Sequence, residues 1–380
     1  MKASVESPVP LLDLGAVHGP LAEELVRDFE RVLRSGQFIL GPEHDAFERE
    51  LAAACSVEHA VGTASGTAAL SIALLALGLG PGAEVIVPAF TYFASASAVT
   101  SLGGRPVFVD VEPDRLGLDP ALVEAAITPR TRAIMAVHLY GLSCELQPLL
   151  DIGARRSIPV LEDAAQAIGA TDRGRPVGTA SAAAALSFFP TKNLGGLGDG
   201  GAILTRDEGV ARRAKLLRVH GDAGDYTHVA LGTNARLDAL QAAFLRTKLR
   251  RLPAWTEERR AIATRYRGAL KGLPVVLPPE PPGATHTYHQ FTIRAPRRDA
   301  LAAHLREHGI ATRVYYPRTV PAQPCFAHLG HSTGDFPVSE RLAGEVLSLP
   351  IYAGLMPERV DRVAREVRAF YENTGGKGAG

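Results

Sequence analysis

Near the middle of the chain stands the stretch Leu186-Ser187-Phe188-Phe189-Pro190-Thr191-Lys192-Asn193, followed at once by Gly195-Gly196-Leu197-Gly198-Asp199-Gly200-Gly201. It places a lysine where an apolar run meets flexible backbone. An apolar setting removes water from the amine of Lys192 and lowers its pKa, which favours the uncharged form that attacks a carbonyl carbon. If this lysine holds the aldehyde of a cofactor, the chain is an enzyme.

The glycine run satisfies the pattern G-x-G-x-x-G, from Gly196 to Gly201, that is associated with dinucleotide binding. That pattern has a mechanism only where it follows a strand and opens a helix, whose N-terminus then binds the pyrophosphate. Here the glycines precede a short apolar segment, Ala202–Leu204, that predicts a strand, and the helical pattern begins only near Asp207. We therefore expect a loop leading into a strand rather than a nicotinamide or flavin site.

The composition is that of an ordinary globular protein. The chain has 380 residues, of which 46% are hydrophobic and 21% charged. This length is enough for roughly two to three domain-sized units. Its formal net charge of +1 gives no electrostatic reason to expect nucleic acid or an acidic membrane surface as a partner.

The cysteines and the apolar segments bear on the compartment. Cys55, Cys144 and Cys325 are an odd number without C-x-x-C or zinc-type spacing, so we expect neither a disulfide framework nor a metal site. The segment Met1–Leu14 has no long apolar stretch of the kind found in signal peptides. Apolar stretches such as Leu70–Leu79 fall short of the roughly twenty residues that span a bilayer. We therefore expect a cytoplasmic protein without a membrane partner.

Short apolar runs alternate with helical patterns through the first two thirds of the chain. Continuous apolar strands between helices are typical of a parallel sheet covered on both faces, so the alternation predicts an α/β domain. The expected strands are Val85–Val87, Pro106–Val111, Ala133–His138, Pro159–Glu162 and Ala182–Phe188, and the expected helices are Gly66–Leu77, Thr91–Leu102 and Leu146–Arg156.

The pattern changes after Asn234, where two long charged helices precede a proline-rich break. We therefore predict a large α/β domain over residues 1–252, including an N-terminal arm, and a small α+β domain over residues 253–380. The elements expected after Asn234 are helices at Leu237–Leu252, Glu257–Leu270, Arg298–Glu307, Ser339–Val346 and Pro357–Tyr371, and strands at Tyr288–Arg294 and Ala311–Tyr316.

Asp163 ends an expected strand, at the edge of a parallel sheet where ligands bind. Taken alone, this aspartate is more simply explained as the N-cap of the helix-like stretch Ala164–Ile168, a contribution of about 1 kcal/mol. Gln166 alone is an ordinary polar residue. The aspartate is thus a candidate site residue with a structural alternative.

Hydroxyl groups and a glycine, Ser65-Gly66-Thr67, precede an apolar helix. Free amide groups and the positive end of the helix dipole make this position a natural seat for a phosphate. Ordinary capping and close helix packing explain the segment equally well. Because no G-K-[ST] follows, hydrolysis of a nucleoside triphosphate is not supported.

A phosphate seat, an aspartate at a strand end and a lysine in a loop together fit one cofactor, pyridoxal 5'-phosphate (PLP). PLP needs an amine for its aldehyde, an anion near its pyridine nitrogen and donors for its phosphate. With its motifs in this order, the chain from about Pro10 to Val367 resembles the DegT/DnrJ/EryC1/StrS family of PLP-dependent sugar aminotransferases, which have the fold-type-I aspartate aminotransferase architecture. The resemblance rests on Ala64–Leu70, Val87–Tyr92, Val137–Gly141, Glu162–Gln166, Ser187–Gly201 and Gly232–Asp238.

The resemblance implies a role for each matching residue. Lys192 would bind the aldehyde of PLP and then move the proton during amino transfer. Asp163 would pair with the protonated pyridine nitrogen, which keeps the ring an electron sink, and Gln166 would bond the ring oxygen. Tyr92 would stack on the face of the ring, a contact that contributes about 1 kcal/mol.

The phosphate of PLP would be held by Ser65, Gly66, Thr67 and Ser187. Asn234 matches a family position that reaches the phosphate from the neighbouring subunit. The resemblance therefore implies a homodimer with shared active sites. An asparagine before a helix is otherwise simply a good N-cap.

The expected sugar site departs from the family pattern. In the segment Val314–Pro317, Tyr315 replaces a histidine, and Phe189 stands where a tyrosine or histidine is common. Phe189, Tyr315 and Tyr316 are therefore candidate substrate contacts with altered hydrogen-bonding groups. The residues from Phe189 to Gly201 most resemble members that aminate C3 of a dTDP-linked 3-keto-deoxysugar. The resemblance thus implies transfer of an amino group, from L-glutamate, to such a nucleotide sugar.

Three alternatives stay open. The first is amination at C4, and the second is a family variant that uses PLP differently, such as an aminohydroxybenzoate synthase. Sugar dehydratases of the family replace the lysine with histidine, so Lys192 disfavours that branch. The third is a scaffold or activator that binds PLP or a nucleotide sugar without turnover, against which the retained lysine argues.

Overall fold

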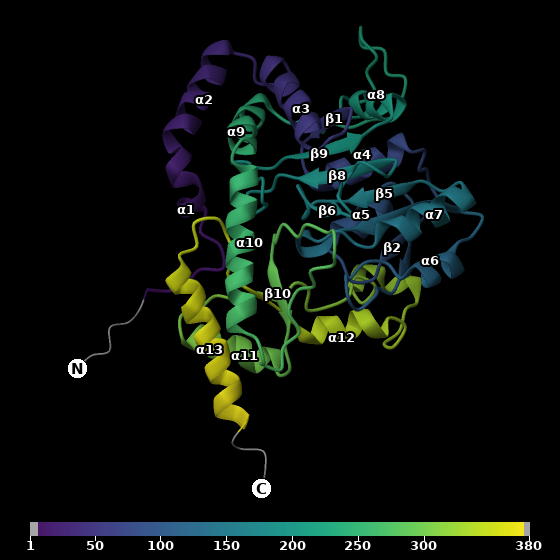
Figure 1. Ribbon diagram of the computed structural model, residues 1–380. Coiled ribbons are helices and arrows are strands. Elements are labelled where there is room, and N and C mark those ends of the chain that lie inside the picture. The colour runs from purple at the N-terminus through teal and green to yellow at the C-terminus, as the bar shows by residue number, and fades with distance from the viewer. Residues whose placement is uncertain (1–6, 376–380) are drawn as a thin grey trace.

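A seven-stranded sheet lies at the centre of the computed structural model, which describes residues 7–375 (Figure 1). The strands are β1 (His59–Thr63), β2 (Glu84–Pro88), β3 (Arg105–Val109), β4 (Thr131–Val137), β5 (Val160–Asp163), β8 (Ala183–Ser187) and β9 (Gly201–Thr205). Their order is β1-β9-β8-β5-β4-β2-β3, and every neighbouring pair from β8 to β3 is parallel. The strand β9 runs antiparallel to both of its neighbours, β1 and β8. The prediction of a mainly parallel sheet is confirmed.

Helices cover both faces of this sheet (Figure 1). They are α3 (Pro42–Ala54), α4 (Gly66–Ala76), α5 (Ala94–Thr100), α6 (Pro120–Ala126), α7 (Leu146–Arg156), α8 (Glu208–Leu217) and α9 (Ala239–Leu249). In β2, Val85 and Val87 join the core cluster formed with α4, α5 and α8, while Ile86 joins the cluster formed with α6 and α7. Successive side chains of a strand point to opposite faces, so a strand buried on both faces requires a continuous apolar run.

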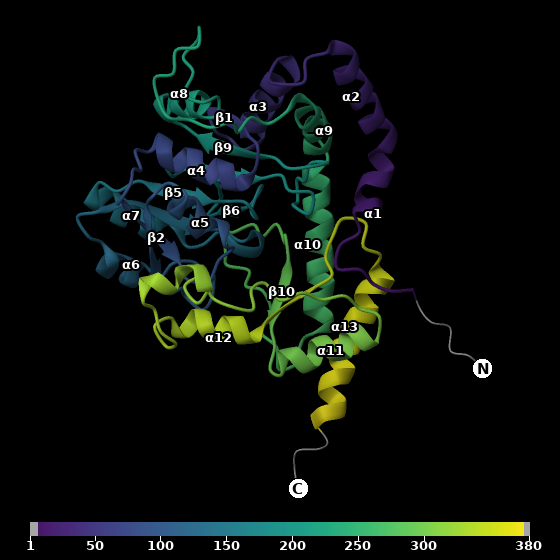
Figure 2. The same cartoon turned by 180° about the vertical axis from the view of Figure 1, so that it is seen from behind.

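A second core lies in the C-terminal part of the chain. There Tyr266 and Phe291 pack with Leu347, and the N-terminal residue Val9 joins the same cluster and pairs with Ile310. The helix α10 runs from α9 past this core to α13 (Figure 2). The elements of this part are α10 (Leu252–Ala269), α11 (Arg298–Glu307), α12 (Pro337–Glu345), α13 (Pro357–Gly375), and the antiparallel strands β10 (Phe291–Arg294) and β11 (Val346–Leu349). The domain boundary at residue 252 stays a prediction.

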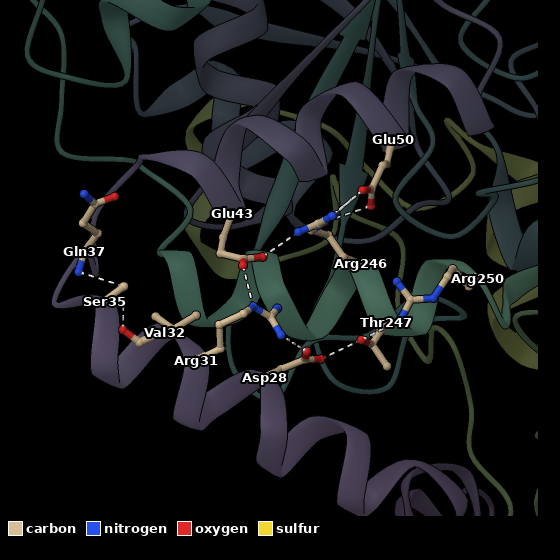
Figure 3. A network of polar contacts seen from close by, with 10 residues as sticks. All are labelled: Asp28, Arg31, Val32, Ser35, Gln37, Glu43, Glu50, Arg246, Thr247 and Arg250. Atoms are coloured by element: carbon tan, nitrogen blue, oxygen red, sulfur yellow. Dashed lines mark hydrogen bonds and ion pairs between the residues drawn. The ribbon is translucent and has the colours of Figure 1, made fainter.

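The remaining elements are short or lie at the N-terminal side. They are α1 (Leu14–His18), α2 (Ala22–Ser35), the short strands β6 (Thr171–Asp172) and β7 (Arg175–Pro176), and the 3-10 helices Gly19–Leu21, Leu139–Gly141 and Pro324–Leu329. The helix α2 is tied to α3 and α9 by the charged network of Figure 3. Arg31 bridges Asp28 and Glu43, and Arg246 joins Glu43 to Glu50.

Two predicted elements are wrong. Ala311–Tyr316 is not a strand, because it makes a single bridge, between Arg313 and Ser348, and then leaves β11 to reach a cavity lined by Tyr315 and Tyr316. The stretch Ala164–Ile168 is not a helix. It forms consecutive turns, closed by hydrogen bonds from the amide of Ala167 to Ala164 and from the amide of Ala170 to Ala167.

The three cysteines are free thiols, of which Cys55 and Cys144 are buried and Cys325 is exposed. In the part of the chain from residue 7 to residue 375, no helix combines the length and the apolar character needed to cross a membrane.

Candidate active site

One cavity of about 450 Å³ gathers nearly all the predicted site residues. It lies at the carboxyl ends of the parallel strands and at the N-terminus of α4, the position that the sheet topology favours for a ligand. Asn234 is the exception, because it is exposed and does not line this cavity. The predicted residues that do line it are Ser65, Gly66, Thr67, Tyr92, Asp163, Gln166, Ser187, Phe189, Lys192, Tyr315 and Tyr316.

Lys192 is carried by a tight loop between β8 and β9. The amide of Gly196 and the carbonyl of Gly200 both bond Phe188, which closes the base of the loop, and the amide of Lys192 donates to the Phe189 carbonyl at 2.8 Å. A Cβ atom on Gly195 would lie 2.3 Å from the Pro190 carbonyl oxygen, so this tight path requires glycine. The loop follows β8 and leads into β9, which confirms the sequence-based interpretation of the glycine run.

The surroundings of Lys192 favour the uncharged amine. Burial lowers the pKa of Lys192 to about 8, while the negative charge of Asp163 acts in the opposite direction. An amine with a pKa near 8 is uncharged in about a tenth of molecules at pH 7, far more than an amine with the usual lysine pKa of about 10.4. It can therefore attack an aldehyde carbon, as the sequence predicts.

Asp163 ends β5 with its carboxylate held from two sides. Its Oδ2 accepts a 2.7 Å hydrogen bond from the hydroxyl of Ser95, which also bonds the hydroxyl of Thr91 at 2.9 Å. Its Oδ1 accepts from the amide of Ala165 at 3.2 Å. Because turns and not a helix follow, the alternative explanation of Asp163 as a helix N-cap is wrong. The side chain lines the cavity instead.

Gln166 connects two parts of the cavity wall. Its Oε1 accepts from the amide of Tyr140 at 2.8 Å, and its Nε2 donates to the hydroxyl of Tyr316 at 3.1 Å. The ring of Tyr316 lies 5.9 Å from that of Tyr92, centroid to centroid. Tyr92 itself is 54% exposed, which leaves a face of its ring available for stacking.

The helix α4 begins at the cavity wall. Ser65 is its N-cap and accepts from the amide of Ala68 at 3.1 Å, so the capping role that the sequence left open is realised. The first amides of the helix, including those of Gly66 and Thr67, have no acceptor within the helix and point along its positive end. A Cβ atom on Gly66 would lie 2.7 Å from the Cβ of Ser187, so the glycine lets Ser187 approach the helix start. The same segment is therefore both a cap and a seat for an anion.

Two other polar residues were missed by the sequence analysis. His138 lines the cavity, and its Nδ1 accepts from the amide of Cys144, so the proton on Nε2 is donated to Glu162 at 2.7 Å. Glu162 is fully buried. Glu162 and Asp163 are neighbours in one strand and point to opposite faces, and Asp163, the last residue of the strand, is the one that lines the cavity.

A buried lysine behind the loop was also missed. The amine of Lys248, on α9, donates to the carbonyl of Gly195 and to Nε2 of His18, the latter at 2.8 Å. The residue is 1% exposed, and burial lowers the pKa of its amine to about 8. No sequence signal distinguishes Lys248 from the other basic residues of its amphipathic helix.

The donor set fits PLP. An amine of lowered pKa, a carboxylate at the edge of the sheet and an anion seat at a helix start surround one cavity, as the aldehyde, the pyridine nitrogen and the phosphate of PLP require. The glycine at position 66 supports this fit, because a side chain there would occupy the space beside Ser187.

Several curated proteins share nearly half of their residues with this chain over almost its whole length. The chain is 49% identical over 362 residues to the "Erythromycin biosynthesis sensory transduction protein EryC1" of Saccharopolyspora erythraea, covering 95% of this chain and 99% of that protein. It is 46% identical over 374 residues to the dTDP-3-amino-3,4,6-trideoxy-alpha-D-glucose transaminase of Streptomyces venezuelae, covering 98% and 99% of the two chains. A UDP-N-acetyl-3-dehydro-alpha-D-glucosamine 3-aminotransferase of Acidithiobacillus ferrooxidans is 44% identical over 360 residues, covering 95% and 97%.

Solved structures of related proteins have the same fold as this chain. The S. venezuelae protein DesV, crystallised with a ketimine intermediate, superposes with a TM-score of 0.94 at 46% identity, covering 96% of this chain and 99% of that one. The NtdA protein of Bacillus subtilis, with bound PMP, gives a TM-score of 0.91 at 33% identity, covering 98% and 87%. These likenesses confirm the expected fold. The model of the DegT/DnrJ/EryC1/StrS aminotransferase family matches residues 20–368, so the chain belongs to this family of PLP-dependent aminotransferases.

Proposed function

We propose that this protein transfers an amino group from L-glutamate to C3 of a nucleotide-linked 3-keto-deoxysugar, with dTDP as the nucleotide. The single observation that carries the proposal is the meeting of Lys192, Asp163 and the α4 anion seat around one cavity. The relatives at 44% and 46% identity act at the same sugar carbon by their names. Those names include both dTDP and UDP sugars, so parallel assays with the two nucleotides test the choice of dTDP.

Each cofactor contact has a defined task in this proposal. When bound, PLP supplies an electron sink that stabilises the charge left on carbon as a proton departs. Lys192 would hold the cofactor through its amine and, once released, would carry that proton between donor and acceptor atoms. Asp163, oriented by Ser95, would pair with the pyridine nitrogen and keep it protonated. Gln166 would bond the ring oxygen, and the exposed ring face of Tyr92 would be available for stacking.

The phosphate contacts in the proposal are Ser65, Gly66, Thr67 and Ser187. The helix start provides amide donors and a positive dipole end, and both favour a dianionic group. Ser187 approaches this seat closely because Gly66 has no side chain. Together these groups anchor the end of the cofactor that lies away from the reacting atoms.

The sugar is proposed to lie against Phe189, Tyr315 and Tyr316. All three line the cavity, and Phe189 is 50% exposed. The hydroxyl of Tyr316 already bonds Gln166, so the part of the wall nearest the cofactor is fixed before substrate enters. Phe189 offers an apolar surface without a hydrogen bond, which suits a deoxygenated sugar carbon better than a hydroxylated one.

A homodimer with shared sites is part of the proposal. Asn234 is exposed and does not line the cavity of its own chain, as expected of a residue that serves the partner. It is not the cap of α9, because Asp238 holds that position. Exposed apolar side chains support a covered surface: Val26, Phe29 and Leu33 share one face of α2, and Leu231, close to Asn234, is 97% exposed.

Mixing two inactive variants tests this arrangement. Lys192→Ala and Asn234→Ala subunits, unfolded and refolded together, should regain roughly a quarter of wild-type activity, because half the dimers are hybrids with one intact site. Each variant refolded alone is the control. A mixture no more active than those controls, or a monomer by light scattering, would contradict the shared site.

The proposal also names L-glutamate as the amino donor and the cytoplasm as the location of the protein. The family resemblance supports L-glutamate, and the free thiols of Cys55, Cys144 and Cys325 are typical of a reducing compartment such as the cytoplasm. Comparing L-glutamate with L-glutamine and L-aspartate as donors tests the first point. A reporter fusion followed in fractionated cells tests the second.

The half-reaction with the donor tests the cofactor chemistry. Adding L-glutamate to PLP-loaded protein should convert the visible absorbance of lysine-bound PLP into that of pyridoxamine phosphate, and Lys192→Ala should not show this conversion. A wild-type protein whose spectrum does not change with any amino donor would instead be a binding scaffold. Conversion with glutamate followed by transfer only to a non-sugar carbonyl would favour the aminohydroxybenzoate synthase alternative.

A further inference from the structure

Three potential metal ligands converge on the C-terminal unit, outside the cavity that holds Lys192. His304 lies on α11, His308 directly follows it, and Glu366 lies on α13. One ligand atom from each residue lies within 4.8 Å of the others. Helices α11 and α13 pack side by side (Figure 1), so the group joins two helices of the small unit.

The distances between the histidine nitrogens and the glutamate oxygen fit ligands around a metal better than direct hydrogen bonds. Nε2 of His304 and Nε2 of His308 lie 3.6 Å and 3.7 Å from the same oxygen, Oε2 of Glu366. Both distances exceed that of a hydrogen bond. In a tetrahedral zinc site, with ligands about 2.0–2.1 Å from the metal, the ligand atoms are about 3.3 Å apart. The two nitrogen–oxygen separations exceed that value by only a few tenths of an ångström.

The protonation state of the imidazoles also suits a metal. Nδ1 of His308 lies 2.8 Å from the carbonyl oxygen of His304 and donates its proton there, so its Nε2 presents a lone pair. A ring nitrogen fixed by a backbone carbonyl is the usual arrangement of a metal-binding histidine. Nε2 of His304 is buried and has no hydrogen-bond partner among the described residues. A bound cation would satisfy this nitrogen.

Two arginines of α13 lie near the group, and one of them, Arg362, donates to the carbonyl oxygen of His308 at 2.7 Å. Arg365 approaches the other oxygen of Glu366, Oε1, at 3.9 Å, and its side chain is 60% exposed. The second His and carboxylate cluster in the described chain, His44 with Asp45 and Glu48, differs in this respect. There Arg218 donates to Glu48 and approaches His44, so a cation already occupies the centre.

We propose that His304, His308 and Glu366 form a binding site for a divalent transition metal, with zinc as the best fit, that clips α11 to α13. Two imidazoles four residues apart and one carboxylate are a ligand set that zinc and nickel take readily, with a fourth position open to water. The cysteine spacing gave no sign of a metal site, and these three ligands include no cysteine.

Calorimetric titration of the PLP-loaded, EDTA-treated and dialysed protein with Zn²⁺ tests the site. Wild type should bind one Zn²⁺ per chain with micromolar affinity and gain thermal stability from it. His308→Ala, at an exposed position, and Glu366→Gln should each weaken binding about tenfold or more. His331→Ala is the matched control, because His331 faces Asp335 at 3.7 Å without a second histidine in that group. It should bind Zn²⁺ like wild type.

Two results would overturn the site. One is the absence of saturable Zn²⁺ binding to wild type. The other is binding that His308→Ala and Glu366→Gln retain at full affinity, which would place the metal elsewhere on the protein. Circular dichroism of each variant without metal shows whether the fold is kept, and the exposed His308 makes that variant the decisive one.

Discussion

The hydroxyl of Ser95 donates a 2.7 Å hydrogen bond to Oδ2 of Asp163, although the two residues are 68 positions apart in the chain. Ser95 is fully buried on α5, and its partner ends β5. The bond fixes the rotation of the carboxylate that the proposal places opposite the pyridine nitrogen. Because Asp163 lies in a buried setting, a charged hydrogen bond of this kind contributes about 1.5–3 kcal/mol.

Ser95→Ala should therefore lower kcat about tenfold while leaving PLP attached, because Lys192 is untouched. Steady-state rates with L-glutamate and the absorbance of bound PLP measure the two effects separately. Ser97→Ala, two residues along the same helix, is the control. A kcat for Ser95→Ala equal to that of the control would show that the hydroxyl does not orient the carboxylate.

The buried amine of Lys248 donates a hydrogen bond to the carbonyl of Gly195, in the loop that carries Lys192. Lys248→Met keeps the volume but leaves that buried carbonyl without a donor, so we expect kcat to fall about tenfold with little change in the KM for glutamate. The absorbance of lysine-bound PLP, followed against pH, should also shift its midpoint, because the loop that carries Lys192 is displaced. Lys271→Met, at an exposed position, is the control. Unchanged kcat and an unchanged midpoint would assign Lys248 a purely structural role.

Glu112 gives the protein a pH-dependent stability. Burial, followed by repulsion from Glu145, raises the pKa of Glu112 to about 7, and within residues 7–375 its Oε1 has no hydrogen-bond partner. The carboxyl binds its proton more tightly in the folded than in the unfolded state, so its stabilising effect is present below pH 4.5 and is lost as the pH rises to about 7.

Glu112→Gln should consequently raise the free energy of unfolding at pH 8 by about 1–2 kcal/mol, a value reduced for the partial exposure of the side chain, and should change it little at pH 4.5. Urea unfolding at the two pH values measures this difference. Glu23→Gln, on the exposed side of α2, should show none. An equal effect of Glu112→Gln at both pH values would contradict the raised pKa.

The local parts of the site were predictable from sequence because each depends on a short segment. The strand end at Asp163, the helix start at Ser65–Thr67 and the glycine loop after Lys192 are set by neighbours in the chain. The mainly parallel character of the sheet, though not its strand order, follows from the alternation of apolar runs and helices. The family resemblance then indicated that these segments meet around one cofactor.

The contacts between distant segments were not predictable in the same way. The amine of Lys248 reaches a carbonyl 53 positions away, and Ser95 was one of several small residues in an expected helix. The strand expected at Ala311–Tyr316 failed because a strand needs a partner along its whole length, and Val346–Leu349 takes that place beside β10. Periodicity reports which face a residue prefers, but it does not report which segments pair.

The most direct test of the account supplies the PLP-loaded protein with ¹⁵N-labelled L-glutamate and, in separate reactions, with 3-keto and 4-keto dTDP-deoxysugars. NMR and mass spectrometry of the isolated product locate the label. The account predicts ¹⁵N on C3 of the 3-keto sugar and no product with Lys192→Ala. Label on C4, or an unlabelled sugar in every reaction, would contradict it.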